Sequence, residues 1–270
     1  MTGVQARYVT EERQPELLFS VCTLVASDDR YKRLLESFER FGFTSETTEF
    51  IALDNRGQNR FDGYSALRRM FPEFRGRYIV MVHDDVELVD DGAEELQTLL
   101  ELLDRQDPQW TLAGCAGWSA DGTELLRHLR DPHGSSRPLT APREAQSLDE
   151  CFLVLPRARA VLPSLDLEGF HLYATDMCVQ ARMAGGRTYV LPFFVHHHSG
   201  GTHGPDLEAS RDAFTRKYEA LDLGTRLRAP AVTVYFGAMG GMRRWLDETG
   251  ARLRHKTRMI ASRAGVQNQK

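Results

Sequence analysis

Four groups of polar side chains interrupt the apolar runs of this 270-residue sequence, and their residue types bind metals or move protons. The first group, His83-Asp84-Asp85, directly follows the apolar run RYIVMV. Carboxylate oxygens suit Mg²⁺ or Mn²⁺, and these ions often bridge to substrate phosphates. If the strand continues through the group, its period of two places His83 and Asp85 on one face and Asp84 on the other. Exposed acids at a helix start are the alternative interpretation.

The second group is His196-His197-His198, which ends another apolar run and precedes a glycine-rich turn. Imidazole nitrogens complete mixed oxygen and nitrogen coordination spheres, and they can also hold a diphosphate. Alternation along a strand places His196 and His198 on one face and His197 on the opposite face. A polar turn with hydrogen-bonded imidazoles is the alternative.

The remaining two groups contain single acids at element ends. Asp176 lies in the first turn of a predicted helix, where it either stabilises the helix or deprotonates a hydroxyl near a metal. Asp54, followed by Asn55 and Arg56, ends a predicted strand. An acid in that place can hydrogen-bond a ribose or base edge, and a simple turn is the alternative.

The elements that must position these groups alternate between strand and helix. Alternation of this kind predicts an α/β protein with a mostly parallel sheet and helices on both faces. Ligands of such sheets bind beyond the carboxyl ends of the strands, where Asp54 and His83 to Asp85 lie. Apolar runs predict strands at 17–26, 47–55, 77–85, 110–118, 147–156 and 188–198, and helical spacing predicts helices at 31–41, 64–71, 92–103, 174–184 and 206–221.

Three further regions lack this alternation. Residues 1–16 are polar and predict a loose arm, and the turn formers of 120–147 predict a loop that orders over a substrate. Residues 17–222 are expected to form the main domain. Residues 223–270 form a C-terminal extension whose basic, amphipathic pattern predicts a helix. That helix rests either on an anionic membrane surface or on the domain or a dimer partner.

Net charge, cysteine spacing and apolar segments indicate what kind of protein this is and where it is located. The formal net charge of −4 disfavours a dedicated nucleic-acid binder. The four cysteines have no C-x-x-C spacing and predict reduced, buried thiols. The N-terminus lacks the apolar segment of a signal peptide, and no apolar stretch reaches the ~20 residues of a membrane span. We therefore expect a cytoplasmic protein, at most peripheral to the inner face of a membrane.

Taken together, the motifs resemble the family-two glycosyltransferases with the GT-A fold. The matching segments are SVCTLVASDD, FIALDN, YIVMVHDDVEL, GFHLYATDMCVQARMAGG and VHHHSGGTH, which follow the order of the family. The nearest likeness is to a subgroup with an H-x-D-V strand end and an H-x-Y-x-x-D motif. The resemblance implies transfer of a sugar from a nucleotide-diphosphate sugar, UDP- or GDP-linked, to a glycan or lipid-linked acceptor, with Mn²⁺ or Mg²⁺ and inversion at the anomeric carbon.

The resemblance also implies roles for individual residues. Asp85 matches the last acid of the D-x-D motif, the usual metal ligand, and His83 stands where that motif has its first acid. His196 or His198 matches a histidine that completes the metal site in some members. The implied donor site comprises Thr23, Val25, Asp54, Asn55, Arg56 and Asp84.

The catalytic base follows the family less closely. Asp176 matches an acid of the motif that supplies the base in inverting members. Tyr173-Ala174 occupy the place of the usual E-D pair, which makes His171 a second candidate.

Other functions remain possible on such a fold. A nucleotidyltransferase is disfavoured because no glycine-rich loop with a lysine follows the first strand, and a Rossmann dehydrogenase because G-x-G-x-x-G is absent there. A non-catalytic nucleotide- or carbohydrate-binding module would bind a nucleotide without turnover. A membrane-peripheral scaffold would depend on residues 231–270.

Overall fold

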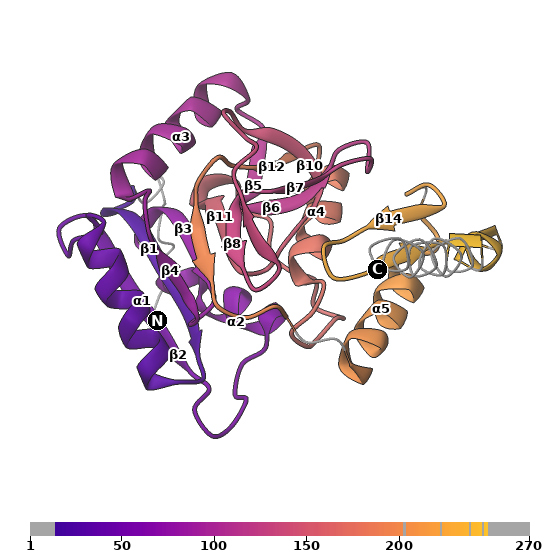
Figure 1. The fold of residues 1–270 in the computed structure, drawn as a ribbon, viewed down its shortest axis with the longest axis horizontal. Coiled ribbons are helices and arrows are strands. Elements are labelled where there is room, and N and C mark those ends of the chain that lie inside the picture. The colour runs from indigo at the N-terminus through magenta and orange to yellow at the C-terminus, as the bar shows by residue number, and fades with distance from the viewer. Residues whose placement is uncertain (1–13, 202–203, 222, 238, 245, 248–270) are drawn as a thin grey trace, which may run out of the picture.

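The computed structural model describes residues 14–201, 204–221, 223–237, 239–244 and 246–247. Its centre is a nine-stranded sheet with the spatial order β2-β1-β3-β11-β5-β12-β10-β6-β7 (Figure 1). The strands of this sheet are β1 (Leu17–Val25), β2 (Thr48–Asp54), β3 (Gly76–Val82), β5 (Trp110–Gly114), β6 (Ala116–Ser119), β7 (Leu125–Arg127), β10 (Arg143–Leu148), β11 (Phe152–Pro156) and β12 (Arg187–Val190).

Most strands of the sheet run in one direction. β1 pairs in parallel with β2 and β3, and β12 pairs in parallel with β5. β11, β10 and β7 run against this direction. The expected α/β class with a mostly parallel sheet is therefore confirmed. The helices are α1 (Asp28–Arg40), α2 (Gly63–Met70), α3 (Ala93–Gln106), α4 (Tyr173–Met183) and α5 (Pro205–Tyr218), with 3-10 turns at Phe71–Glu73 and Arg157–Arg159.

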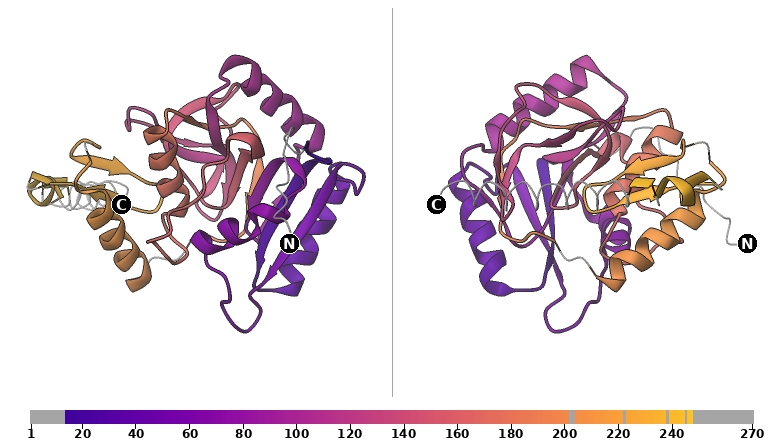
Figure 2. Two further views of the ribbon diagram at one scale, coloured as in Figure 1. Left: turned by 180° about the vertical axis from the view of Figure 1, so that it is seen from behind. Right: turned by 45° about the vertical axis from the view of Figure 1, so that its right-hand side comes forward.

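Side chains of β3 contribute to two cores, one on each face of the sheet. Val80 and Val82 pack with apolar side chains of α1 and α3. Ile79 and Met81 pack with those of α2 and α4 on the other face. Because helices cover both faces, as the two views of Figure 2 show, an uninterrupted apolar run is required here rather than alternation.

A second, four-stranded sheet has the order β4-β13-β8-β9 and carries the histidine cluster. The prediction of a loop over 120–147 is wrong, because this region contains β7, β8, β9 and most of β10. The turn formers mark bends between strands of three residues, and β8 pairs with the distant β13. The strands of this sheet are β4 (Val86–Leu88), β8 (Leu129–Asp131), β9 (Gly134–Ser136) and β13 (Val195–His197).

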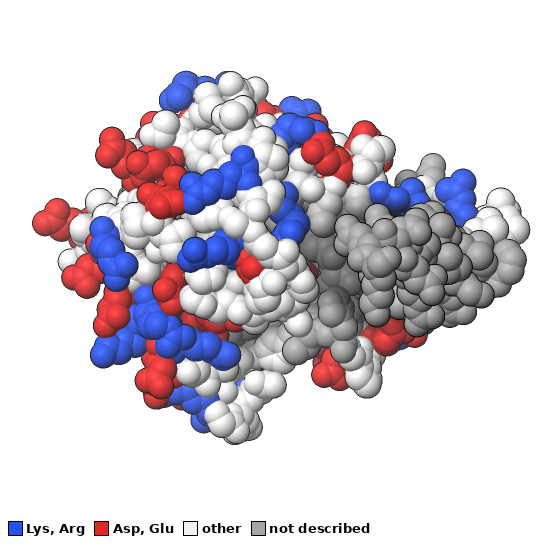
Figure 3. All heavy atoms as spheres, in the orientation of Figure 1, with Lys and Arg blue, Asp and Glu red and all other residues white. Residues whose placement is uncertain are grey.

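The C-terminal region begins with α5 and a two-stranded hairpin, β14 (Arg226–Arg228) and β15 (Thr233–Tyr235). Residues 239–244 are helical, but most of the predicted basic helix lies outside the described residues, as does most of the N-terminal arm. None of the described helices has the length and apolar character needed to cross a membrane. On the face drawn in Figure 3, basic and acidic side chains are intermixed and no broad field of one sign forms.

Candidate functional site

The site forms where β3 ends and the second sheet begins. The amide of His83 still bonds to the carbonyl of Cys151 on the neighbouring strand, at 3.0 Å. The chain then turns, since the amide of Val86 donates to the carbonyl of His83 at 3.2 Å, the bond of a β-turn. The segment from His83 to Asp85 therefore leaves the strand, and strand alternation no longer decides where its side chains point.

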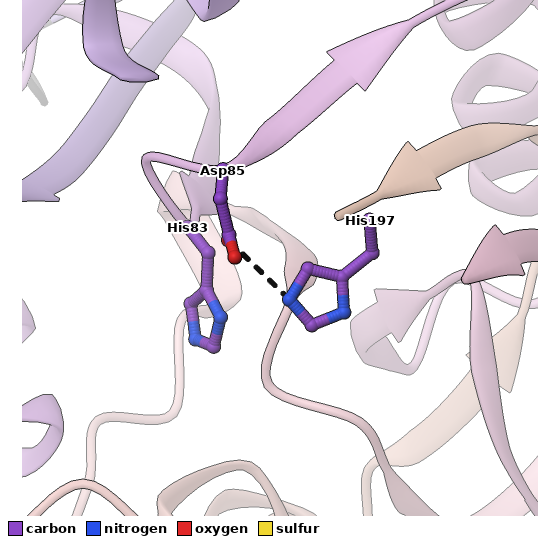
Figure 4. A group of neighbouring side chains, drawn as sticks. All are labelled: His83, Asp85 and His197. Atoms are coloured by element: carbon purple, nitrogen blue, oxygen red, sulfur yellow. Dashed lines mark ion pairs between the residues drawn. The ribbon is translucent and has the colours of Figure 1, made fainter. Parts of the chain in front are cut away.

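Three side chains converge at this turn: His83, Asp85 and His197 (Figure 4). One potential ligand atom from each lies within 4.8 Å of the others. His197 Nε2 lies 3.4 Å from Asp85 Oδ1, and the rings of His83 and His197 are 5.5 Å apart. Asp85 and His197 are each 8% exposed, so the group opens to solvent only narrowly.

The electrostatics of the group favour a charged Asp85. Burial opposes its ionisation, but hydrogen bonds and charge from His197, together with His83, lower its pKa. Burial also lowers the pKa of His197, but the hydrogen bond and charge of Asp85 outweigh it and raise that pKa. Burial and the neighbouring His197 lower the pKa of His83, which favours the neutral imidazole that binds metals.

This donor set fits a divalent cation. A carboxylate and two imidazoles provide mixed oxygen and nitrogen ligands, which Mn²⁺ accepts more readily than Mg²⁺. Tyr173 hydroxyl lies 3.2 Å from His83 Nε2, and Ser199 Oγ lies 3.1 Å from His197 Nε2. Ser199 contacts the same His197 nitrogen that faces Asp85, so of these two partners only the Tyr173 hydroxyl is placed to orient a ring that binds a metal. As ligands, these three side chains would leave other coordination positions of a cation open.

A second potential ligand group shares His197 and adds Asp149 and Cys151. Cys151 Sγ lies 3.6 Å from Cys115 Sγ, and both thiols are buried. The hydrogen bond to Cys115 and burial raise the pKa of Cys151 well above its usual value. Because a thiolate is the ligand form of cysteine, this second group is the poorer metal site. All four cysteines are free and buried, as predicted.

The structure brings His197, and neither His196 nor His198, to Asp85. His196 Nδ1 lies 2.9 Å from an Arg130 nitrogen, and His198 Nε2 lies 2.9 Å from a carboxylate oxygen of Glu87. The rings of His196 and His198 contact each other at 3.9 Å on the other side of β13. His196 and His198 share one side of β13 and His197 lies on the other, as predicted. The side that meets Asp85 is that of His197 and not the predicted one, because the turn after His83 ends β3.

Asp84 organises the loop after β1. Its Oδ2 accepts hydrogen bonds from the amides of Ala26 and Ser27, at 2.8 and 3.0 Å, and Arg30 forms an ion pair with the same carboxylate at 3.1 Å. Asp84 is 6% exposed. Asp84 therefore fixes the position of the β1–α1 loop relative to the group of His83, Asp85 and His197.

A pocket of about 220 Å³ lies between this loop and the group of His83 and Asp85. Leu24 and Ala26 line it, whereas the predicted Thr23 and Val25 are buried, at 1% and 4% exposure, and do not line it. Each of the two lining residues is thus one position further along the chain than the residue that was predicted. The remaining lining residues are Arg30, Asn55, Asn59, Asp84, Phe170, Tyr173 and Ser199.

The segment after β2 forms the outer rim of this pocket. Asn55 Oδ1 accepts from the amides of Arg60 and Phe61, both at 3.0 Å, so Asn55 shapes the loop that it begins. Asp54 pairs with Arg56 at 2.9 Å and with Arg60 at 3.1 Å. The hydrogen bonds from Arg56 lower the pKa of Asp54 to about 2. Neither Asp54 nor Arg56 is among the residues that line the pocket.

Asp176 lies away from solvent inside a hydrogen-bond network. It is 0% exposed and accepts from the Ser164 amide and hydroxyl, each at 2.7 Å, and from the Tyr218 hydroxyl at 2.5 Å. Both carboxylate oxygens are thus occupied. The geometry does not support the predicted role as base, because no acceptor hydroxyl can reach Asp176 without opening the core.

A larger pocket of about 470 Å³ lies on the other side of the group of His83, Asp85 and His197. It shares His83, Phe170 and Ser199 with the smaller pocket. His171 lines it, as does the pair Asp149-Glu150. This acidic pair was not among the predicted site residues, although it precedes the buried strand β11 much as Asp84-Asp85 precede β4.

Two solved structures resemble the fold of this chain. GalNAc-T7, determined with UDP, GalNAc and Mn²⁺, aligns with 77% of this chain at a TM-score of 0.57 and 11% identity. This chain spans 48% of that protein. S. aureus TarS 1-349, in complex with UDP-GlcNAc, aligns with 77% of this chain at a TM-score of 0.51 and 11% identity, over 68% of TarS. These similarities show that the fold is that of the GT-A glycosyltransferases.

A similar sequence occurs in Fuscovulum blasticum. No protein-family model matches the chain. The Fuscovulum protein is named "ATP synthase subunits region ORF 6", which states a reading frame and no activity. It is 42% identical to this chain over 217 residues, which cover 78% of this chain and 87% of that protein. The chain therefore belongs to the same protein family as the Fuscovulum blasticum ATP synthase subunits region ORF 6.

Proposed function

We propose that this protein is a metal-dependent glycosyltransferase that moves a sugar from a nucleotide-diphosphate sugar to an acceptor hydroxyl. The observation that carries the proposal is the convergence of His83, Asp85 and His197 between two pockets that share His83. The GT-A fold supports it, and so do the UDP and Mn²⁺ in the structure of GalNAc-T7.

Each part of the site has a place in this reaction. Asp85, His83 and His197 would hold Mn²⁺, which supplies positive charge to the departing diphosphate. The smaller pocket, lined by Arg30 and Asn59, takes the nucleotide of the donor. Its volume of about 220 Å³ accommodates part of a UDP- or GDP-linked donor. The larger pocket then takes the acceptor, a glycan or a lipid-linked saccharide.

The reaction is a direct displacement with inversion at the anomeric carbon. The acceptor oxygen attacks from the larger pocket, opposite to the diphosphate in the smaller pocket. The shared position of His83 and Phe170 between the pockets agrees with this arrangement. Proton nuclear magnetic resonance of the product would distinguish inversion from retention.

The proposal is tested by turnover of a panel of donors. UDP-N-acetylglucosamine and GDP-mannose are incubated with the chain, with Mn²⁺ or with a chelator, and release of the nucleoside diphosphate is measured. We expect release that requires Mn²⁺ and is lost in Asp85→Ala. Tight binding of UDP or GDP without any turnover would favour a non-catalytic binding module. Absence of both binding and turnover would refute the proposal.

A further inference from the structure

The proposed reaction requires a group that accepts the proton of the attacking hydroxyl, and this inference rests on that proposed function. Asp176 is enclosed by Ser164 and Tyr218. At the start of α4, Tyr173 and Ala174 offer no carboxylate. A base must therefore come from another element that reaches the larger pocket.

Glu150 belongs to such an element. It lies in the turn between β10 and β11 and lines the larger pocket together with His83 and His197. The Tyr173 hydroxyl donates to the Glu150 carbonyl at 3.2 Å and also lies 3.2 Å from His83 Nε2. One tyrosine thus connects the backbone of Glu150 to a residue of the metal-binding group.

The carboxyl group of Glu150 lies at the beginning of α4. The backbone amides of Leu172 and Ala174 act on it and lower its pKa. Leu172 has a φ of 66° and is the single non-glycine residue of the described part of the chain with a positive φ. Residues in such conformations cluster at functional sites. Here it turns the helix start toward the Glu150 carboxyl.

We propose that Glu150 is the general base of the reaction. Its carboxylate takes the proton of the acceptor hydroxyl while the acceptor oxygen forms a bond to the anomeric carbon. The bond from that carbon to the diphosphate oxygen breaks, and the nucleoside diphosphate leaves with the electron pair. A carboxylate supplied by the β10–β11 turn thereby occupies the start of α4, where Tyr173 and Ala174 have none.

The surroundings of Glu150 suit this role. Burial, and then the charge of Asp149, raise the pKa of Glu150 to about 8, while the amides of Glu150, Leu172 and Ala174 lower it. A base with a pKa near the working pH combines sufficient ionisation with sufficient proton affinity. The neighbouring Tyr173 and Tyr64 have raised pKa values, chiefly from burial, and stay protonated.

The test compares Glu150→Gln with two matched variants. His171→Gln removes the competing candidate in the same pocket, and Glu144→Gln makes the same chemical change at an exposed position of β10. Calorimetry measures the Kd for UDP with Mn²⁺. Hydrolysis of UDP-N-acetylglucosamine and GDP-mannose, with water as acceptor, measures kcat and KM.

We expect Glu150→Gln to bind UDP within about threefold of wild type and to lose about 100-fold or more in kcat. Glu144→Gln should match the wild type in both measurements. Wild-type kcat in Glu150→Gln, or a 100-fold loss in His171→Gln alone, would overturn the assignment of the base and leave the proposed function standing. Failure of the wild-type chain to bind UDP or GDP, or to hydrolyse either donor, would instead overturn the proposed function and this inference with it.

Discussion

Asp176→Ala should destabilise the protein rather than remove a catalytic group. The substitution deprives the three closest donors of their acceptor: the Ser164 amide, the Ser164 hydroxyl and the Tyr218 hydroxyl. Each unsatisfied buried donor costs about 1 kcal/mol or more. Three such donors, with the cavity left by the carboxyl group, give a loss of about 3–5 kcal/mol, as is found when one partner of a buried charged network is removed.

Urea unfolding at equilibrium measures this loss. Asp212→Ala is the matched control, because Asp212 lies on the surface of α5 with a side chain 58% exposed, and it should keep near wild-type stability. In conditions where Asp176→Ala remains folded, its kcat should lie close to that of the wild type. A variant with wild-type stability and a kcat reduced 100-fold would instead show that Asp176 acts as the base.

Two further predictions concern the metal-binding group. Mn²⁺ should bind more tightly as the pH rises from about 6 to 8, because Asp85 raises the pKa of His197 and a ligand imidazole must lose its proton. Calorimetry at several pH values measures the Kd for Mn²⁺, and a constant Kd would contradict the prediction. Gly63→Ala should lower stability by about 1–3 kcal/mol and weaken Mn²⁺ binding, because the new Cβ would lie 2.2 Å from the Tyr173 ring that contacts His83. Gly204→Ala, which meets no atom within 4 Å, is the control, and equal effects of the two substitutions would contradict the prediction.

Local sequence patterns were sufficient for the first half of the fold. The apolar runs that became β1 and β3 are buried on both faces, so they could be read without knowing their neighbours. The first-turn acids of α1 and the left-handed Gly42 just after it mark both ends of that helix. The short strand β8 could not be read in this way, because it depends on pairing with the distant β13.

The errors within the site have the same physical origin. The turn from His83 to Val86 removes the regular alternation on which the choice of His196 and His198 depended. A shift of one residue separates the predicted Thr23 and Val25 from the residues that line the pocket, since neighbouring side chains of a strand point to opposite faces.

The packing around α4 explains why Asp176 was predicted as the base and Glu150 was not. Nearly every residue of α4 is buried, which the pattern of Ala174, Met177 and Val179 around Asp176 could have indicated. Glu150 was overlooked because its contacts with α4 depend on how the β10–β11 turn packs, which no local pattern shows.

The proposed function depends above all on the binding of one divalent cation by Asp85, His83 and His197. Titration with Mn²⁺, followed by electron paramagnetic resonance of the free ion, measures the affinity directly and requires no substrate. His196→Ala changes the preceding residue, whose ring points to the other side of β13, and therefore serves as the matched control. We predict a single site in the wild type, similar affinity in His196→Ala, and affinity at least about tenfold weaker in His197→Ala. Loss of the site in His196→Ala with full binding in His197→Ala would contradict the account.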